Sequence, residues 1–212
     1  MYAVGKIPGG FNKREGKASE HAILTCRVID RPMRPLFPKD YRNDVTLNNM
    51  VMSVDPQCNP EVVAMLGSSI ATCISDIPFD GPCAATQVGM IDGELIINPT
   101  LEQNSRSDLK LTVASTREKV IMIEAGANEV PEAKMIEAIF EADKVNKEII
   151  AFIDKIVADC GKAKHSYESC AVPEELFAAM KEIVTPEEME VAVFSDDKQT
   201  REENIRQVTA KL

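Results

Sequence analysis

Basic and aromatic side chains gather near the start of the chain, within "GGFNKREGKASEHAILTCRVIDRPMRPLFP", residues 9–38. The basic and aromatic residues of this segment include Phe11, Lys13, Arg14, Arg27, Arg31 and Arg34. Aromatic rings stack on bases, and Lys and Arg bind phosphates and release counterions. A local excess of positive charge is therefore a hint of contact with a polyanion.

The charge of the chain is distributed unevenly. Residues 1–42 contain nine Lys or Arg and four Asp or Glu, a local charge of +5, whereas the whole chain carries -10, so the remainder carries -15. A polyanion should therefore contact the N-terminal segment and avoid the rest. Charge runs are also commonly solvated faces, and charge alone favours that alternative.

The composition is that of an ordinary globular protein, with 44% hydrophobic residues in 212. No run approaches the roughly 18 apolar residues that a membrane span needs, and the first ten residues have no apolar core of a signal peptide. We therefore expect a cytoplasmic protein without membrane contact.

The cysteines and histidines do not suggest a metal site. Six cysteines lack any C-x-x-C pair, and there are only two histidines. Reduced structural thiols are the favoured interpretation. A cysteine nucleophile paired with His21 or His165 remains an alternative at this point. No phosphate loop, G-x-S-x-G or H-E-x-x-H motif is present, so we expect no catalytic residue in this chain.

The elements that must position the basic residues begin with a predicted helix over 18–30. It is apolar almost all round, which favours a buried helix, and Pro32 should end it and leave Arg34 in an extended segment. Residues 44–54, rich in β-formers, predict a strand. Asn59 and Pro60 then predict the start of another helix. Its expected apolar face comprises Val62, Leu66, Ile70, Cys73 and Ile77.

The middle of the chain predicts a sheet and a long helix. Asp92 and Gly93 indicate a hairpin turn, and strands should follow over 109–116 and 119–126, the second buried on both faces. A helix is predicted over 131–158, with a core-facing stripe. That stripe comprises Met135, Ile139, Ala142, Asn146, Ile149, Ile153 and Ile156, and its one amide suggests a wet or partner-facing spot.

A change of composition near 160–172 indicates a boundary, followed by two helices over 173–184 and about 186–210. The predicted organisation is a core domain over 1–160, a linker over 161–172 and a small helical segment over 173–212. The second unit is too short to hold a large core of its own.

The stretch "GKIPGGFNKREGKASEHAILTCRVIDRPMRPLFP" closely resembles the first RNase PH-like core of the bacterial polynucleotide phosphorylase family. The segments "VDPQCNPEVVAMLGSSIA" and "IPFDGPCAATQVG" resemble the same core, and the acidic region after it resembles the family's all-helical domain. The resemblance implies an α+β fold, in which a mixed sheet with packed helices precedes a small all-helical segment. The family's leading strands come before the position that matches Tyr2, so the core would lack them.

The resemblance also implies a function. Members of this family degrade RNA from its 3′ end with phosphate as co-substrate and release nucleoside diphosphates, as in mRNA degradation. They are homotrimeric rings with a central pore, and other proteins of RNA degradation are candidate partners. The second core of each subunit binds Mg²⁺ and phosphate. That core is absent here, so this chain alone should be inactive.

By resemblance, the segment would guide RNA through the pore and help to assemble the trimer. Phe11, Lys13 and Arg14 match the pore loop, in which Asn12 replaces a second aromatic residue, and the three arginines from Arg27 to Arg34 match residues that bind RNA. Arginines near a helix C-terminus can also be structural, and Asp30 could pair with one. The alternative function is a stand-alone, non-catalytic remnant that binds RNA or a protein.

Overall fold

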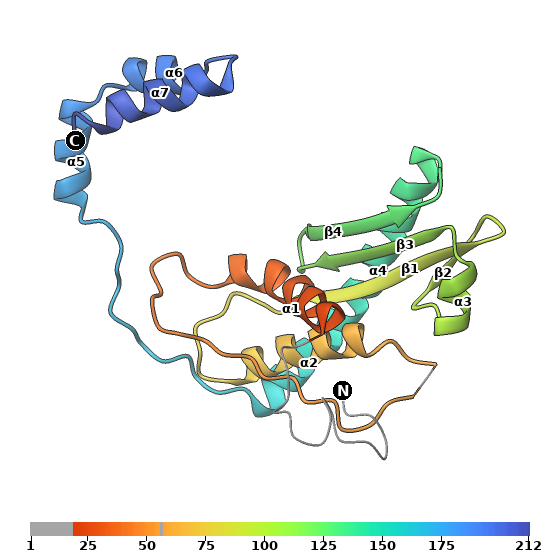
Figure 1. Cartoon of the computed structure of the whole chain (residues 1–212). Helices are drawn as coiled ribbons and strands as arrows, with labels where there is room; N and C mark the ends of the chain where they lie inside the picture. Colours follow the sequence, from red (N-terminus) through yellow and green to blue (C-terminus); the bar gives the residue numbers. More distant parts are fainter. Residues whose placement is uncertain (1–18, 56) are drawn as a thin grey trace, which may run out of the picture. The chain divides into compact units, whose positions relative to one another are not determined.

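The computed structural model describes residues 19–55 and 57–212, and the chain divides into two compact units between Tyr167 and Glu168. The first unit holds four α-helices, a short 3₁₀ helix and a four-stranded sheet within its described residues (Figure 1). In chain order the elements are α1 (Glu20–Met33), α2 (Pro60–Ile74), β1 (Ala84–Ile91), β2 (Glu94–Ile97), α3 (Leu101–Arg106), β3 (Leu109–Ser115), β4 (Val120–Ala127) and α4 (Glu132–Cys160). The predicted α+β class is confirmed.

The sheet has the strand order β2-β1-β3-β4 and is antiparallel throughout the described residues, where the family resemblance implies a mixed sheet. The predicted hairpin is confirmed. Asp92 and Gly93 connect β1 to β2 with φ of 52° and 83°. Both values lie in the left-handed region that Gly tolerates and Asp adopts more readily than most residues, so this dipeptide sets the register of the hairpin.

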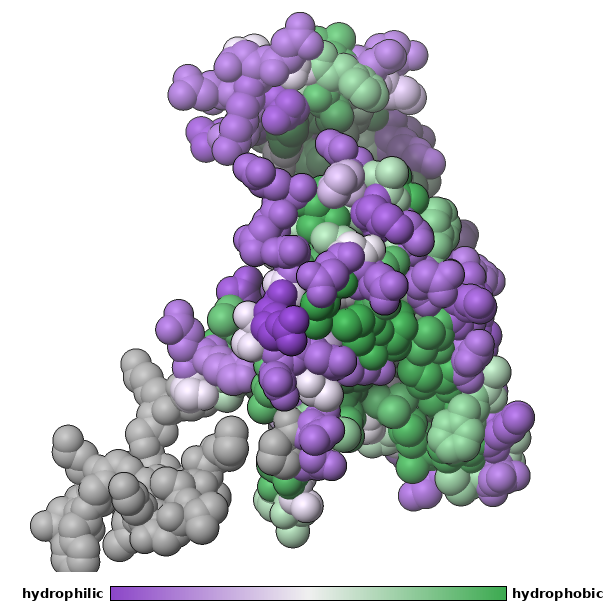
Figure 2. Space-filling view, turned by 90° about the vertical axis from the view of Figure 1, so that its right-hand side faces the viewer, coloured by the Kyte–Doolittle hydropathy of each residue, from purple (hydrophilic) through white to green (hydrophobic). Residues whose placement is uncertain are grey.

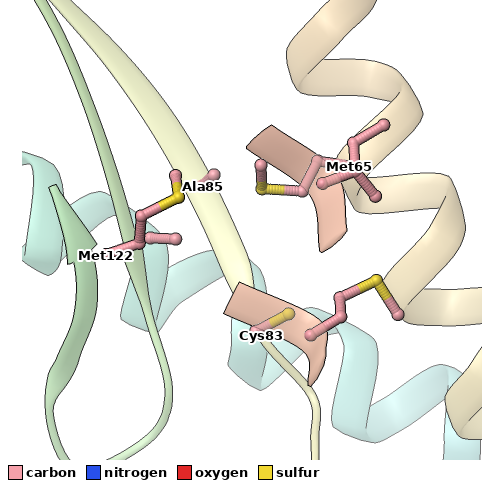
Figure 3. Close-up of a cluster of buried hydrophobic side chains, with 7 residues drawn as sticks. Met65, Cys83, Ala85 and Met122 are labelled. Atoms are coloured by element: carbon pink, nitrogen blue, oxygen red, sulfur yellow. The ribbon is translucent and has the colours of Figure 1, made fainter. Parts of the chain in front are cut away.

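The two faces of the sheet pack against different helices, because side chains alternate along a strand. Leu109, Leu111 and Val113 of β3 face α4, where they pack with Ala138 and Ala142. The opposite face packs against α1 and α2. The buried side chains on this side form a second hydrophobic cluster. Figure 3 shows part of it, with Met65 of α2 near Cys83, Ala85 and Met122.

The buried amide of Asn146 joins α4 to the sheet. Its Oδ1 accepts a hydrogen bond of 2.7 Å from Thr86, and its Nδ2 donates to the carbonyl of Val113 at 3.0 Å and to Ser115 at 3.2 Å. The side chain has no solvent exposure. The prediction of a wet or partner-facing spot is therefore wrong, because the polar partners of the amide come from β1 and β3.

The strand β4 lies at the edge of the sheet, and most of its residues are exposed. The prediction that it is buried on both faces is wrong. Most residues of β3, the strand that pairs with a neighbour along each edge, are buried instead. Apolar composition marks both strands as β-formers but does not decide which one lies in the middle. Figure 2 shows hydrophobic and hydrophilic residues interspersed on the face that it displays.

No strand forms over 44–54, contrary to the prediction. The segment is extended and runs beside α2, where Ser68 donates a hydrogen bond of 3.0 Å to Asn49. Met50 and Met52 are 74% and 84% exposed. The β-forming composition is present, but within the described residues no neighbouring strand supplies a hydrogen-bonding ladder.

The predicted start of α2 is confirmed, since Asn59 accepts a hydrogen bond from the Glu61 N–H at 2.9 Å. The predicted apolar face is only partly correct. The buried residues of α2 are Met65, Ser68, Ser69, Thr72 and Cys73, whereas the other predicted residues within the helix are half-buried. Ser68 and Thr72 can be buried because their hydroxyls donate to carbonyls four residues earlier.

The segment 162–167 is fastened to the first unit by several polar contacts. The ammonium of Lys164 donates to the carbonyls of Thr72, Cys73 and Ser75 at 3.3, 2.8 and 2.7 Å. These are carbonyls at the C-terminal end of α2, where a cation interacts favourably with the helix dipole. Tyr167 in turn donates to Asp40 at 2.8 Å.

The second unit contains α5 (Glu174–Ile183), α6 (Pro186–Val193) and α7 (Lys198–Thr209). The single helix predicted over 186–210 is wrong, since α6 ends before Phe194 and α7 begins after Asp197. Asp197 accepts a hydrogen bond from the Thr200 N–H at 2.8 Å and thereby caps a new helix. No helix in the described residues combines the length and apolar character needed to cross a membrane.

We expect Asn146→Ala to lower the free energy of unfolding by about 2–4 kcal/mol, because it leaves a cavity and removes the partners of buried polar groups. Urea denaturation followed by circular dichroism measures the change. Asn48→Ala, at an exposed position, is the control and should cost less than about 0.5 kcal/mol. Equal midpoints for the two variants would contradict the proposed role of the amide.

Candidate functional site

The helix α1 carries the described part of the basic N-terminal cluster. Ser19 caps it by accepting a hydrogen bond from the Ala22 N–H at 3.2 Å. The prediction that Pro32 ends the helix is wrong, because α1 continues through Pro32 to Met33. Proline lacks an N–H, so only one carbonyl of the helix loses its partner here. The helical hydrogen bonding continues after it, since the backbone N–H of Arg34 donates to the carbonyl of Asp30.

Arg34 lies in a helical conformation, with φ of -54° and ψ of -45°, at the start of a short 3₁₀ helix (Arg34–Leu36). The prediction of an extended backbone at Arg34 is therefore wrong. The continued helical geometry brings Arg27, Arg31 and Arg34 onto one stripe, because residues three and four apart are neighbours on a helix surface.

The prediction that α1 is buried is also wrong. Only Ile29, Pro32 and Met33 are buried, while Ile23 and Leu24 are about half exposed. The C-terminal half of the helix packs on α2 and the sheet, and the rest of its surface faces solvent. All three arginines of the stripe are exposed.

The arginines differ in their partners. Arg34 donates from Nε and Nη2 to the same oxygen of Asp30, at 3.1 and 2.6 Å. This hydrogen bond and the charge of Asp30 raise the pKa of Arg34. Neither Arg27 nor Arg31 pairs with a carboxylate of any described residue. Two cations of the stripe are thus available to an external anion. Phe11, Lys13 and Arg14 lie outside the described residues.

A groove of about 690 Å³ adjoins the C-terminal end of α1. We call it the basic groove, because Arg34, Lys39 and Arg42 line it together with a single carboxylate, that of Asp30. The aromatic rings of Phe37 and Tyr41 also line it. Lys39 and Arg42 are not among the residues predicted from the sequence, although "FPKDYRN" alternates aromatic and basic residues in the way that nucleic-acid contacts often do.

A second cavity, of about 320 Å³, lies between α1, α2 and the sheet. Its polar centre is Glu61, which accepts hydrogen bonds of 3.3 Å from Thr25 and from Gln87 and lies 3.2 Å from Nδ1 of His21. Lys110 and Glu124 also line the cavity. Its carboxylates would repel a phosphate, so the basic groove is the better anion site.

The thiols and histidines form no nucleophilic pair among the described contacts. All six cysteines are free, and burial raises the pKa of Cys83 to about 11 and also raises that of Cys73. Such thiols carry little thiolate and are poor nucleophiles. His21 contacts Glu61, and His165 contacts Tyr41 at 3.4 Å. No group of three possible metal ligands occurs in the described part of the chain.

Two family descriptions match this sequence. Residues 1–78 match domain 1 of the 3′ exoribonuclease family, and residues 81–145 match domain 2. The chain belongs to the 3′ exoribonuclease family. The predicted family resemblance is thereby confirmed.

Curated relatives extend the comparison to the whole chain. Polyribonucleotide nucleotidyltransferase of Lachnoclostridium phytofermentans is 76% identical over 212 residues, which are 100% of this chain and 30% of that protein. The enzyme of the same name from Clostridioides difficile is 50% identical over 208 residues, covering 98% of this chain and 29% of its own length. This member of the 3′ exoribonuclease family therefore spans about 30% of the length of these relatives.

A solved structure supports the fold. Rice (Oryza sativa) Rrp46 superimposes with a TM-score of 0.54 at 11% identity, covering 68% of this chain and 69% of that one. At this identity the similarity shows the fold alone. The predicted RNase PH-like core is confirmed.

We expect Asp30→Asn to tighten the binding of a single-stranded RNA oligonucleotide roughly two- to fivefold at 0.1 M salt, because Arg34 then keeps no charged partner. Fluorescence anisotropy with a labelled ten-nucleotide oligo(A) measures the affinity. Glu137→Gln, which removes a carboxylate paired with Lys134 on α4, is the control and should leave the affinity unchanged. An equal effect of both substitutions would show a general charge effect instead.

Proposed function

We propose that this chain is the first RNase PH-like core and part of the all-helical domain of a phosphate-dependent 3′-to-5′ exoribonuclease. Residues 1–160 are the core, 161–172 the linker and 173–212 the helical segment. The names of the relatives support an activity on polyribonucleotides. The observation that carries the role of this segment is the exposed stripe of α1, where Arg27 and Arg31 lack a carboxylate partner among the described residues.

The stripe would guide the RNA backbone. Arg27 and Arg31 are one helical turn apart, so both can approach phosphates of one strand. Contacts of this kind release counterions and do not depend on base identity, which suits an enzyme that degrades all RNAs. Phe11, Lys13 and Arg14 would add a stacking and phosphate contact in a central pore, with the chain assembled as a cytoplasmic homotrimer.

In this proposal, the catalytic residues belong to the longer polypeptide. Phosphate as co-substrate and Mg²⁺ would bind to a second core, and none of the residues named here is a catalytic group. The contribution of this chain is then to hold the RNA and to deliver its 3′ end. If the chain acts alone instead, it is a non-catalytic module that binds RNA or a protein.

The chain alone should not phosphorolyse RNA, because we assign no catalytic group to it. Incubation with poly(A), phosphate and Mg²⁺, followed by chromatography of nucleotides, should give no ADP above a buffer control. A longer polypeptide that contains this segment and a second core should release ADP under the same conditions. ADP from the chain alone would overturn this division of roles, and no ADP from the longer polypeptide would favour the binding-module alternative.

In that longer enzyme, Arg27→Ala with Arg31→Ala should weaken the binding of single-stranded RNA about equally for all sequences. The slope of log affinity against log salt should fall by about 1.4, which is about 0.7 for each lost phosphate contact. Filter binding at several salt concentrations measures both. Lys144→Ala with Lys155→Ala, on exposed positions of α4, removes the same charge and should leave the slope nearly unchanged.

A further inference from the structure

The basic groove combines two features that a single-stranded polynucleotide requires. Its walls supply cations from Arg34, Lys39 and Arg42 against the one carboxylate of Asp30, a surplus of two positive charges. They also supply the rings of Phe37 and Tyr41. Phosphates need the first feature and bases need the second.

The cations of the groove have unused binding capacity. Arg42 donates from Nη1 to the carbonyls of Lys39 and Tyr41, at 2.6 and 3.3 Å, and these bonds hold its guanidinium in place. Its other N–H groups bind no described residue. The Lys39 side chain makes no hydrogen bond or ion pair within residues 19–55 and 57–212, and both Lys39 and Arg42 are exposed. Each can therefore bind a phosphate without losing a protein partner.

The rings are supported from behind. Phe37 packs on Phe79 with ring centroids 4.9 Å apart. Tyr41 and Tyr167 form a T-shaped contact, with ring centroids 5.0 Å apart and an angle of 89° between the ring planes. Both rings are half-buried, so each is supported on one side while part of it remains accessible from the groove.

The groove is also fixed without a ligand. The Asp80 N–H donates to the carbonyl of Leu36, the residue that precedes Phe37, at 2.8 Å. The hydroxyl of Tyr167 donates to Asp40 at 2.8 Å, beside Tyr41. Walls held in this way lose little conformational entropy when a ligand binds, which favours affinity.

We propose that the basic groove is a binding subsite for single-stranded polynucleotide, in which Lys39 and Arg42 hold phosphates and Tyr41 stacks on a base. The subsite continues the stripe of α1, because Arg34 belongs to both. The choice of RNA as ligand rests on the proposed function. The paired aromatic rings favour a polynucleotide over an acidic peptide, which would need only the cations.

The test is the binding of labelled ten-nucleotide oligo(A) to the 212-residue chain, measured by fluorescence anisotropy. Lys39→Ala with Arg42→Ala should weaken binding roughly 10- to 30-fold at 0.1 M salt and lower the salt slope by about 1.4. Lys144→Ala with Lys155→Ala is the matched control and should change neither. Lys39→Ala alone, which disturbs no described contact, should lower the slope by about 0.7.

The stacking step has its own pair of variants. Tyr41→Leu should weaken oligo(A) binding roughly fivefold or more with little change of slope, whereas Tyr41→Phe should bind nearly as the parent chain does. Equal affinities for Tyr41→Leu and Tyr41→Phe would overturn the assignment of stacking. Competition by a ten-residue poly-Glu peptide as strong as that of unlabelled oligo(A) would overturn the assignment to polynucleotide.

A third comparison separates this proposal from the proposed function. If Arg27→Ala with Arg31→Ala weakens binding while the groove variants match the control, the groove assignment is wrong and the guidance role of α1 stands. If the groove variants alone weaken binding, the groove is the RNA contact and the role of the stripe is wrong. If none of these variants weakens binding, both proposals are overturned.

Discussion

The buried amide of Asn146 connects the two layers on which the first unit depends. It bonds to Thr86 of β1 and to Val113 and Ser115 of β3, so α4 can pack on the sheet in only one register. An apolar contact slides at little cost, whereas a buried amide in a shifted register would lose its partners. The position of α4 fixes which face of the sheet remains for α1 and α2.

That second face explains the placement of the basic residues. Ile29 and Met33 anchor the C-terminal half of α1 in the cluster with Met65 and Met122. Once this half is anchored, the helical period directs Arg27 and Arg31 to solvent. The extra turn beyond Pro32 brings Arg34 to the edge of the basic groove. The same packing thus supports the fold and the arginine stripe.

Local chemistry made much of this structure predictable. The Asn59–Pro60 helix start, the Asp92–Gly93 turn and the long helix over about 131–158 each follow from a preference of a few neighbouring residues, and the structure contains all three. The predictions that depend on distant partners were less successful. Residues 44–54 form no strand and β4 is an exposed edge, because ladder partners and the order of strands are tertiary properties.

The candidate site, too, has features that were predictable from the sequence and features that were not. The shared stripe of Arg27 and Arg31 was predictable from their spacing, and their exposure was not, since α1 has the apolar composition of a buried helix. Lys39 and Arg42 were not predicted, because the alternation of aromatic and basic residues in this loop is too short to be decisive before the fold places both cations in one groove with Arg34.

The two units differ in the charge that they would present to an anionic strand. Residues 168–212 contain eleven Asp or Glu and five Lys or Arg, a net charge of -6. Within this second unit, pairs such as Lys211 with Glu188 at 2.6 Å neutralise only some of the carboxylates. If the groove and the stripe bind RNA as proposed, an anionic strand would be attracted to them and repelled by the acidic helical unit. Salt screens this attraction and repulsion beyond about 10 Å at 0.1 M salt, so both act only on a strand that is already close to the protein. Arg27, Arg31, Lys39 and Arg42 have no carboxylate partners among the described residues. In the proposed function, this unpaired positive charge distinguishes the RNA-binding surface from the acidic helical unit.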